Sequence, residues 1–297
     1  MLKDKFYWVE TERGFCPVFT LIPEEKSPIV LFCHDYKGSC HETNRLFWHL
    51  SRSLYKAGIG SVRFDYNGFG NSSGNSAGFT IETAANDALT VLRQVRTLPN
   101  VNEECISLIG IGMGGRIAAC LLGNISDLKA GILLNPADSH FKNKEELEEL
   151  TFGFEGDTAW DGGCEFSKDF FNAELFGKGS EEITESATSV MIITGYDDDF
   201  IFHKTSEAYR EKLPSIRYEE IMDADHYFSS PDAYKEVETL VISFLKETLL
   251  GEEHKVVEKE ALPPEVINNL AQQPLDEESE DSPDSNNPVE EESNAEA

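Results

Sequence analysis

The fold is decided by the stretch Ile106-Ser-Leu-Ile-Gly-Ile-Gly-Met-Gly-Gly-Arg-Ile-Ala-Ala119. The apolar residues before the glycines predict a buried strand, and the residues after them predict a helix. A glycine-tight turn between a strand and a helix is the frame of the G-x-S-x-G motif, which presents a serine at its apex. The apex residue in this chain is Gly112, which has no side chain to act as a nucleophile.

Three other segments surround this turn in the sequence. Residues 28–39 and 60–74 are each an apolar strand followed by a loop, and the first of these loops starts at His34. A later strand at residues 190–195 is followed by Asp198, and the segment Ala224-Asp-His226-Tyr-Phe comes after it. One hydrolase architecture has its serine first in the chain, its acid second and its histidine third, and the motifs here follow that order.

On these motifs the chain resembles an α/β hydrolase of the bacterial serine-aminopeptidase and cinnamoyl-esterase type, over residues 6–249. The resemblance implies that Asp198 is the triad acid, that His226 is the base and that Gly112 marks the missing nucleophile. It also implies that the oxyanion hole is formed by the backbone N–H groups of Met113 and Tyr36. Because Asp198 lies between two other aspartates, the assignment of the acid stays open by one residue.

A glycine run of this kind also occurs in the phosphate loop of dinucleotide-binding folds. In those folds the run belongs to the first βα unit, and an acid ends the next strand. Here the run follows three earlier strands, and the next strand, at residues 129–134, ends in Asn135-Pro136. The order of elements therefore favours the hydrolase interpretation, in which no cofactor is expected.

Two further positions depart from the family pattern. Asp35 stands where the His-Gly pattern of the family has glycine, and Asn67 stands where the family usually has arginine. A carboxylate at residue 35 would oppose a developing oxyanion if it pointed inward. The change at Asn67 is expected to alter loop packing.

Other polar residues near the expected site have structural alternatives. His34 is expected to hold the first loop, and His226 has the alternative of capping a helix or lying on the surface. Ser39, Ser72 and Ser73 are candidate substitute nucleophiles, but serines in such loops more often bond their own turns. The His and acidic residues show no spacing typical of a metal site.

Composition limits the classes of partner. The 297 residues carry a formal net charge of −30, which disfavours nucleic acid and anionic lipid as partners. No segment predicts a signal peptide or a membrane span, so a cytoplasmic protein is expected. Six cysteines without metal or redox spacing are expected to be reduced thiols, which serve as small apolar residues.

Strands and helices alternate after an opening hairpin, which predicts an α/β fold: an eight-stranded, mostly parallel sheet with helices on both faces. We expect one domain over residues 1–250, with a cap insertion at residues 139–187, where the periodicity fails. Residues 251–297 are rich in acids and are expected to be disordered, either as an interaction tail or as a solubilising extension. The aromatic residues of the cap either line a pocket or, for most of them, pack the cap onto the domain: Phe152, Phe154, Trp160, Phe166, Phe170 and Phe171.

Helices are expected at residues 41–57, 81–98, 115–122, 203–213 and 232–250. Strands are expected in the opening hairpin, at residues 6–10 and 16–22, and then near residues 28–33, 59–64, 105–110, 129–134, 189–194 and 217–221.

Three functions follow from this pattern. Loss of the triad nucleophile costs about 10⁶ in kcat, so the first is a pseudo-hydrolase that binds a small acyl, aromatic or peptide-like molecule or a protein partner. The second is an ester or amide hydrolase, or a lyase, that uses His226 and Asp198 on water or substrate without an acyl-enzyme. The third is a scaffold that binds a protein through its acidic tail. The pseudo-hydrolase hypothesis depends on an unfilled place beside Gly112. An oxygen or sulfur atom of another residue in that place would contradict the hypothesis.

Overall fold

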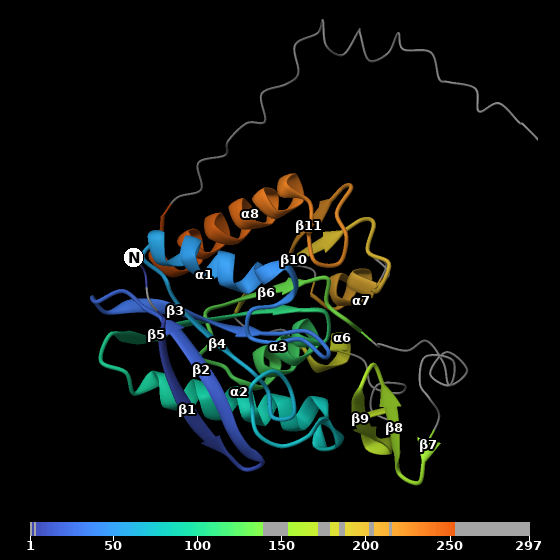
Figure 1. Cartoon of the computed structure of the whole chain (residues 1–297). Coiled ribbons are helices and arrows are strands. Elements are labelled where there is room, and N and C mark those ends of the chain that lie inside the picture. Colours follow the sequence, from blue (N-terminus) through green and yellow to red (C-terminus); the bar gives the residue numbers. More distant parts are fainter. Residues whose placement is uncertain are drawn as a thin grey trace, which may run out of the picture. The chain divides into compact units, whose positions relative to one another are not determined.

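A single twisted sheet of eight strands forms the centre of the fold (Figure 1). The computed structural model describes residues 2, 4–138, 154–171, 179–183, 188–201, 205–213 and 216–252. The chain divides into a unit Met1–His254 and a second unit Lys255–Ala297, and only the first is described below. Expectations about the tail therefore lie outside the described residues.

The strands of the sheet follow the order β1-β2-β4-β3-β5-β6-β10-β11. β1 and β2 form the opening antiparallel hairpin, β2 pairs antiparallel with β4, and the pairs from β4 to β11 are parallel. This topology confirms the predicted mostly parallel sheet of an α/β hydrolase. The strands are β1 (Lys5–Thr11), β2 (Gly14–Leu21), β3 (Ser27–Cys33), β4 (Gly60–Phe64), β5 (Val101–Ile111), β6 (Ala130–Leu134), β10 (Ser189–Gly195) and β11 (Arg217–Ile221).

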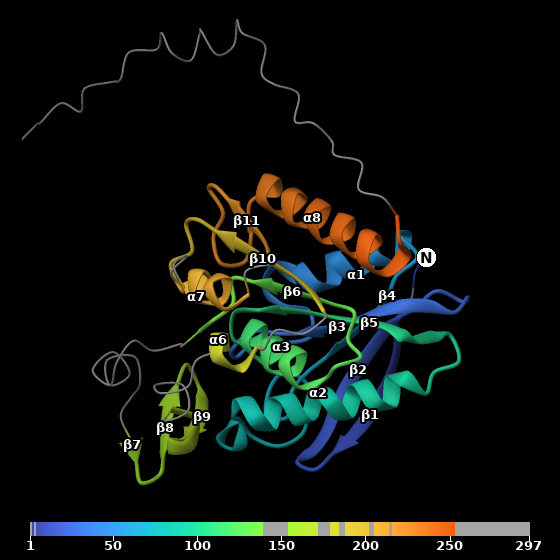
Figure 2. The ribbon, with the colours of Figure 1, turned by 180° about the vertical axis from the view of Figure 1, so that it is seen from behind.

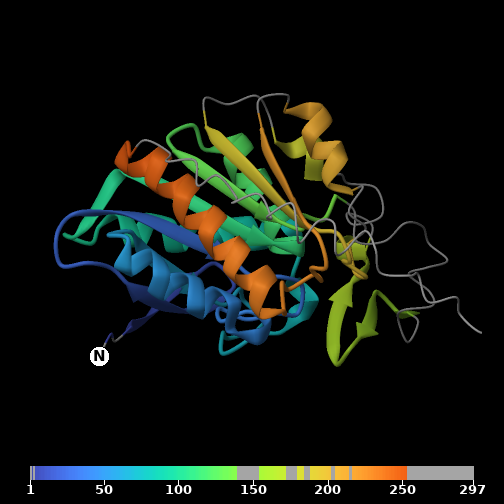
Figure 3. The same ribbon diagram turned by 90° about the horizontal axis from the view of Figure 1, so that it is seen from above.

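Helices cover both faces of this sheet. α1 and α8 lie on one side, and α2 and α3 lie on the other (Figures 2 and 3). The helices that flank the sheet are α1 (Leu46–Lys56), α2 (Ile81–Arg96), α3 (Gly112–Asn124), α7 (Thr205–Lys212) and α8 (Pro231–Leu250), and a short helix, α6 (Gly179–Glu182), contacts α3.

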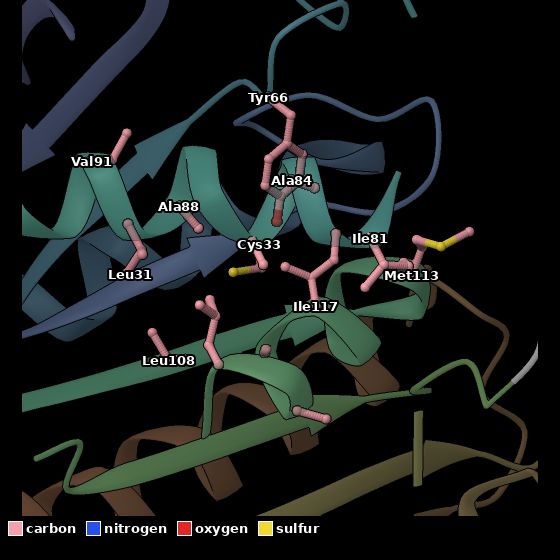
Figure 4. Close-up of a cluster of buried hydrophobic side chains, with 14 of the residues drawn as sticks. Leu31, Cys33, Tyr66, Ile81, Ala84, Ala88, Val91, Leu108, Met113 and Ile117 are labelled. Atoms are coloured by element: carbon pink, nitrogen blue, oxygen red, sulfur yellow. The ribbon is translucent and has the colours of Figure 1, made fainter. Parts of the chain in front are cut away.

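The central strands are apolar on both faces because each face has its own core. In β3, Leu31 packs with the α2 and α3 side chains, whereas the next residue, Phe32, packs with α1 and α8. Figure 4 shows part of the first core, in which Leu31 of β3 lies near Ala88 of α2 and Cys33 of β3 lies near Ile117 of α3. Near-continuous apolar strands are therefore a consequence of burial on both sides of the sheet.

Two helix starts differ from the prediction for local backbone reasons. The helix expected from residue 41 begins at Leu46, because Asn44 and Arg45 adopt left-handed backbone angles, with φ of 54° and 61°. The helix expected from residue 115 begins at Gly112, directly after β5. The starts of the other long helices have the expected chemistry: the Thr80 side chain caps α2, and the Ser230 side chain caps α8.

Part of the expected cap is a small antiparallel sheet of β7 (Phe154–Glu155), β8 (Thr158–Asp161) and β9 (Cys164–Ser167). Phe166, Phe170 and Phe171 are buried in the same core cluster as side chains of the domain, and Phe166 and Phe170 contact Phe69 and Tyr36, whereas Trp160 is exposed. Packing is thus the observed role of these three rings. Phe152, the side chain of Phe154 and the rest of the expected cap, residues 139–153, 172–178 and 184–187, lie outside the described residues.

Two expectations from composition can be set beside the structure. In the part of the chain that the structure describes, every helix is too short or too polar to cross a membrane. All six cysteines have free thiols.

Candidate functional site

The predicted turn lies at the carboxyl end of β5, where the chain enters α3. Gly112 has a left-handed φ of +53°, as expected of the strained residue at such an apex. Two positions further on, Gly114 lies so close to Cys33 in β3 that a Cβ atom would overlap the Cys33 carbonyl. The turn therefore packs tightly against the end of β3, from which the next residues of the site come.

The structure brings the predicted acid and histidine together. His226 Nδ1 lies 2.6 Å from Asp198 Oδ2, and both side chains are buried. Asp198 Oδ1 accepts hydrogen bonds from the backbone N–H groups of Phe200 and Ile201, which fixes the carboxylate. The neighbouring Asp197 and Asp199 are exposed, so the geometry selects Asp198.

Asn135, at the end of β6, joins this pair to the sheet. Its amide nitrogen donates to the His226 carbonyl at 2.8 Å, and its amide oxygen accepts from the backbone N–H of Gly195 at 2.7 Å. The loop that carries His226 is therefore tied to β6 and β10 through one buried side chain.

The place beside Gly112 is filled by Asp35, and the expectation of an unfilled place is wrong. A Cβ atom at Gly112 would overlap the Asp35 carboxylate, whose Oδ1 is the nearest atom. On its other side, Asp35 Oδ2 lies 3.0 Å from His226 Nε2, the nitrogen that would face a serine hydroxyl. Sequence reasoning left the direction of this side chain open, and the structure points it inward.

The Asp35 carboxylate also fills the predicted oxyanion hole. The backbone N–H of Met113 donates to Asp35 Oδ1 at 2.7 Å, and the backbone N–H of Tyr36 also hydrogen-bonds to this carboxylate. The Tyr227 hydroxyl donates to Oδ2 at 3.4 Å. Both N–H groups assigned to a substrate oxyanion are thus bonded to a side chain of the protein itself.

The charges of the site follow from these contacts. Burial alone would lower the pKa of His226, but its hydrogen bonds to Asp198 and Asp35 outweigh burial and raise the pKa to about 10. Burial alone would raise the pKa of Asp35, but the hydrogen bond and the charge of His226 hold that pKa below its usual value. The resting site is therefore an imidazolium between two carboxylates.

Sequence reasoning missed a third acid, Glu42, which is buried under the same loop. Glu42 Oε2 accepts from the backbone N–H of Asp35 at 2.7 Å, and Oε1 accepts from the backbone N–H of Thr43 at 2.9 Å. Burial and the nearby Asp35 charge raise the pKa of Glu42 to about 7. This side chain sets the backbone position of Asp35, and nothing in its sequence spacing indicates that role.

His34, Ser72 and Ser73 have structural roles, as the sequence allowed. His34 is buried, and its Nε2 accepts from the backbone N–H of Tyr66, so it holds the first loop. Ser72 donates to the carbonyls of Tyr66 and Phe69 within its own turn, and the Ser73 hydroxyl accepts from the backbone N–H of Phe15. Neither serine hydroxyl takes the place of the missing nucleophile.

Asn67 also has a structural role. Its backbone N–H and its side-chain amide both donate to the carboxylate of Asp87 in α2.

Tyr36 connects the site to the cap. Its hydroxyl donates to Asp161 at the end of β8 at 2.8 Å, and Lys37 pairs with the same carboxylate at 2.9 Å. Its ring lies parallel to that of Phe170, with 5.5 Å between the centroids. The loop that carries Asp35 is therefore fastened to the cap next to the oxyanion hole.

Comparison with known proteins agrees with this fold. Residues 24–148 match the model of the serine aminopeptidase family S33. A structure of Est1E from Butyrivibrio proteoclasticus with bound ferulic acid superposes with a TM-score of 0.71 at 20% identity, covering 82% of this chain and 99% of that one. A structure of DcsB with its substrate analogue gives 0.71 at 16% identity, covering 84% of this chain and 100% of that one.

One curated relative matches a shorter part of the chain. It is a 31.7 kDa protein from the traX-finO intergenic region of Escherichia coli, 28% identical over 90 residues. The match spans 30% of this chain and 30% of that protein.

Topology and structural comparisons thus define an α/β-hydrolase fold. The chain is similar to a serine aminopeptidase family in sequence and to esterases in structure.

Proposed function

We propose that this protein is a pseudo-serine hydrolase, which keeps the fold and the acid–histidine pair of its relatives but does not form an acyl-enzyme. The sequence-based form of this hypothesis depended on an unfilled place at Gly112, and the Asp35 oxygen contradicts that form. The proposal rests on a different observation: the Asp35 carboxylate occupies both the place of the serine oxygen and the oxyanion hole. A substrate carbonyl needs that hole when its oxygen becomes negative. In this site the hole already holds a negative oxygen.

The same contacts argue against ester or amide hydrolysis by the His226 and Asp198 pair alone. A general base needs a free nitrogen that faces the attacking water. His226 Nε2 instead lies 3.0 Å from Asp35, and a pKa of about 10 keeps the ring protonated at neutral pH. The geometry therefore favours binding over carbonyl hydrolysis.

We propose that the ligand is a small aromatic or acyl molecule without negative charge. Asp35, Asp198 and Glu42 would repel an anion, and the exposed ring of Phe200 lies 5.5 Å from that of His226 at the edge of the site. The ring of the ferulic acid bound in the similar Est1E structure supports an aromatic ligand, whereas a carboxylate such as that of ferulic acid would be repelled by the acids of this site. A peptide-like ligand or a protein partner at this edge is compatible with the same surface.

The test is to rebuild the serine site. Gly112→Ser alone is expected to give no ester cleavage, because its Cβ atom meets Asp35. Asp35→Gly combined with Gly112→Ser restores the family pattern and frees both N–H groups, so it should cleave p-nitrophenyl acetate and be labelled by a fluorophosphonate.

The matched control combines Gly112→Ser with Asp157→Asn, which removes an exposed carboxylate from the cap. Cleavage and labelling by the double variant, but not by this control, would support the proposal. Ester cleavage by the native chain that is lost in His226→Ala would refute it.

A further inference from the structure

The opening hairpin, which forms one edge of the sheet, contains a hollow of about 520 Å³. The hollow is lined by Trp8 of β1, by Phe15 of β2 and by three residues of the loop after β4, namely Asn71, Ser72 and Ser73. These residues are different from those that form the acid–histidine site. The hollow is therefore a separate candidate for ligand binding.

Two aromatic rings form the apolar wall of the hollow. Trp8 and Phe15 lie on the same face of the hairpin, because Phe15 faces Glu10, which is two residues from Trp8 along β1. Trp8 is 51% exposed and Phe15 is 47% exposed, whereas the opposite face of the hairpin is part of the core shared with α2. Exposed rings that gather at one hollow indicate a binding site, unlike rings scattered singly over a surface.

The polar wall of the hollow is held in place by hydrogen bonds within the chain. The backbone N–H of Phe15 donates to Ser73 Oγ at 2.6 Å, and the backbone N–H of Ser73 donates to the Phe15 carbonyl at 3.0 Å. The backbone N–H of Asn71 donates to Asp65 Oδ2 at 2.8 Å. The loop is thus fixed before any ligand binds, so a ligand does not have to order it.

The hydrogen-bonding capacity that remains in this wall indicates which groups a ligand must carry. The Ser72 hydroxyl donates to carbonyls of its own turn at 2.7 Å, and the Ser73 hydroxyl donates to the Phe15 carbonyl at 3.5 Å. Toward a ligand, both serines therefore offer oxygen lone pairs as acceptors. The exposed Asn71 amide offers both a donor and an acceptor. A ligand with hydroxyl groups satisfies this combination, because a hydroxyl both donates and accepts.

Charge restricts the ligand further. The residues that line the hollow are all uncharged, so an ionic ligand would lack a counter-ion among them. The net charge of −30 on the chain also opposes the approach of an anion. The hollow thus favours a neutral molecule that has an apolar face and a hydroxyl-bearing edge.

We propose that this hollow binds a neutral saccharide, whose C–H face lies on the rings of Trp8 and Phe15 while its hydroxyl groups bond to Asn71, Ser72 and Ser73. A pyranose ring with equatorial hydroxyls has flat faces made of C–H groups and a rim of hydroxyls. This shape matches an aromatic wall beside a polar one. The proposal goes beyond the proposed function and does not depend on it.

A proline-rich peptide is the main alternative ligand, because aromatic grooves also bind polyproline II helices. Proline has no N–H group, so such a peptide presents mainly carbonyl acceptors. The acceptor oxygens of Ser72 and Ser73 would then have no donor in the ligand. The remaining capacity of the polar wall therefore favours the saccharide.

The experiment is an NMR titration of the full native chain with methyl β-cellobioside, a neutral disaccharide whose ring hydroxyls are all equatorial. The indole N–H signal of Trp8 and the side-chain amide signals of Asn71 should shift, whereas the indole signal of Trp160, exposed on the cap, should not. A titration in which the Trp8 and Asn71 signals stay fixed would overturn the inference. Shifts of these signals with a hexaproline peptide but not with the disaccharide would also overturn it.

A pair of variants tests the apolar wall. Trp8→Ala should weaken binding of methyl β-cellobioside about tenfold, because an aromatic anchor is lost. Trp160→Ala, which removes another exposed tryptophan, is the matched control and should bind as the native chain does. Equal affinity of the native chain and Trp8→Ala would contradict the role of the ring. An unchanged Tm of Trp8→Ala would show that any loss of affinity is not caused by unfolding.

These results are independent of the test of the proposed function. Trp8 and Trp160 lie outside the contacts of Gly112 and Asp35, so saccharide binding can fail while the pseudo-serine hydrolase stands. Ester cleavage by the native chain would refute the pseudo-serine hydrolase and leave the saccharide site intact.

Discussion

At the scale of single residues, Gly112 and Asp35 depend on each other. Asp35 fits in the oxyanion hole because residue 112 has no Cβ atom, and a side chain at residue 112 would displace the carboxylate. The sequence displayed both departures from the family pattern. Their spatial coupling was not visible, because the two residues are 77 positions apart in the chain.

The first residue-scale prediction concerns the protonation of His226. NMR titration of its ring should give a pKa of about 10 in the native protein and a clearly lower value in Asp35→Asn, because one of the two carboxylates is lost. Asp157→Asn, which removes an exposed carboxylate of the cap that pairs with Lys168, is the control. An unchanged pKa in Asp35→Asn would contradict the ion pair.

The same shift sets a pH dependence of stability. Because the pKa of His226 is raised on folding, its stabilisation is complete below the unfolded value of about 6.5 and is lost as the pH rises through about 10. The free energy of unfolding, measured in urea from pH 6 to pH 10, should therefore fall more steeply for the native protein than for Asp35→Asn.

At the scale of elements, the cap hairpin is fastened through one carboxylate. Asp161 accepts the Tyr36 hydroxyl and pairs with Lys37, which joins β8 to the loop that carries Asp35. Asp161→Asn should weaken both contacts and raise amide hydrogen exchange in β8 and β9 while exchange in β3 and β5 stays slow. Asp157→Asn is the matched control, and equal exchange in the two variants would show that the contacts do not hold the hairpin.

The sequence predicted the elements better than their ends. All eight strands of the main sheet were expected. The opening hairpin was expected from its alternating pattern, and the central strands from apolar runs that are buried between two layers of helices. The start of α1 was missed by several residues. Asn44 and Arg45 adopt left-handed angles that their residue types tolerate without requiring, so only the packed loop decides them.

At the scale of the whole molecule, charge and core are unevenly distributed along the chain. The core residues that the structure describes all lie in Met1–His254, and residues 255–297 contain two lysines and thirteen acids. A chain that ends at His254 should therefore unfold at the same Tm as the full chain, within about 2 °C, by circular dichroism. A larger fall in Tm would assign the tail a structural role.

The same truncation tests the scaffold hypothesis. Loss of a protein partner on truncation, with unchanged binding of an aromatic ligand, would support a tail that acts separately from the pocket.

The sequence by itself determined the sheet and its cover of helices on both faces, because apolar periodicity is a local property that burial on both faces enforces. Its resemblance to a known family indicated His226 and, to within one residue, Asp198. Only the tertiary structure decided what fills the place of the missing serine. The direction of Asp35 depends on N–H groups of Met113 and Tyr36, the His226 ring and the backbone support of Glu42, which come from different loops. A contact among such loops is fixed by the packing of the sheet and not by the residues next to it in the chain.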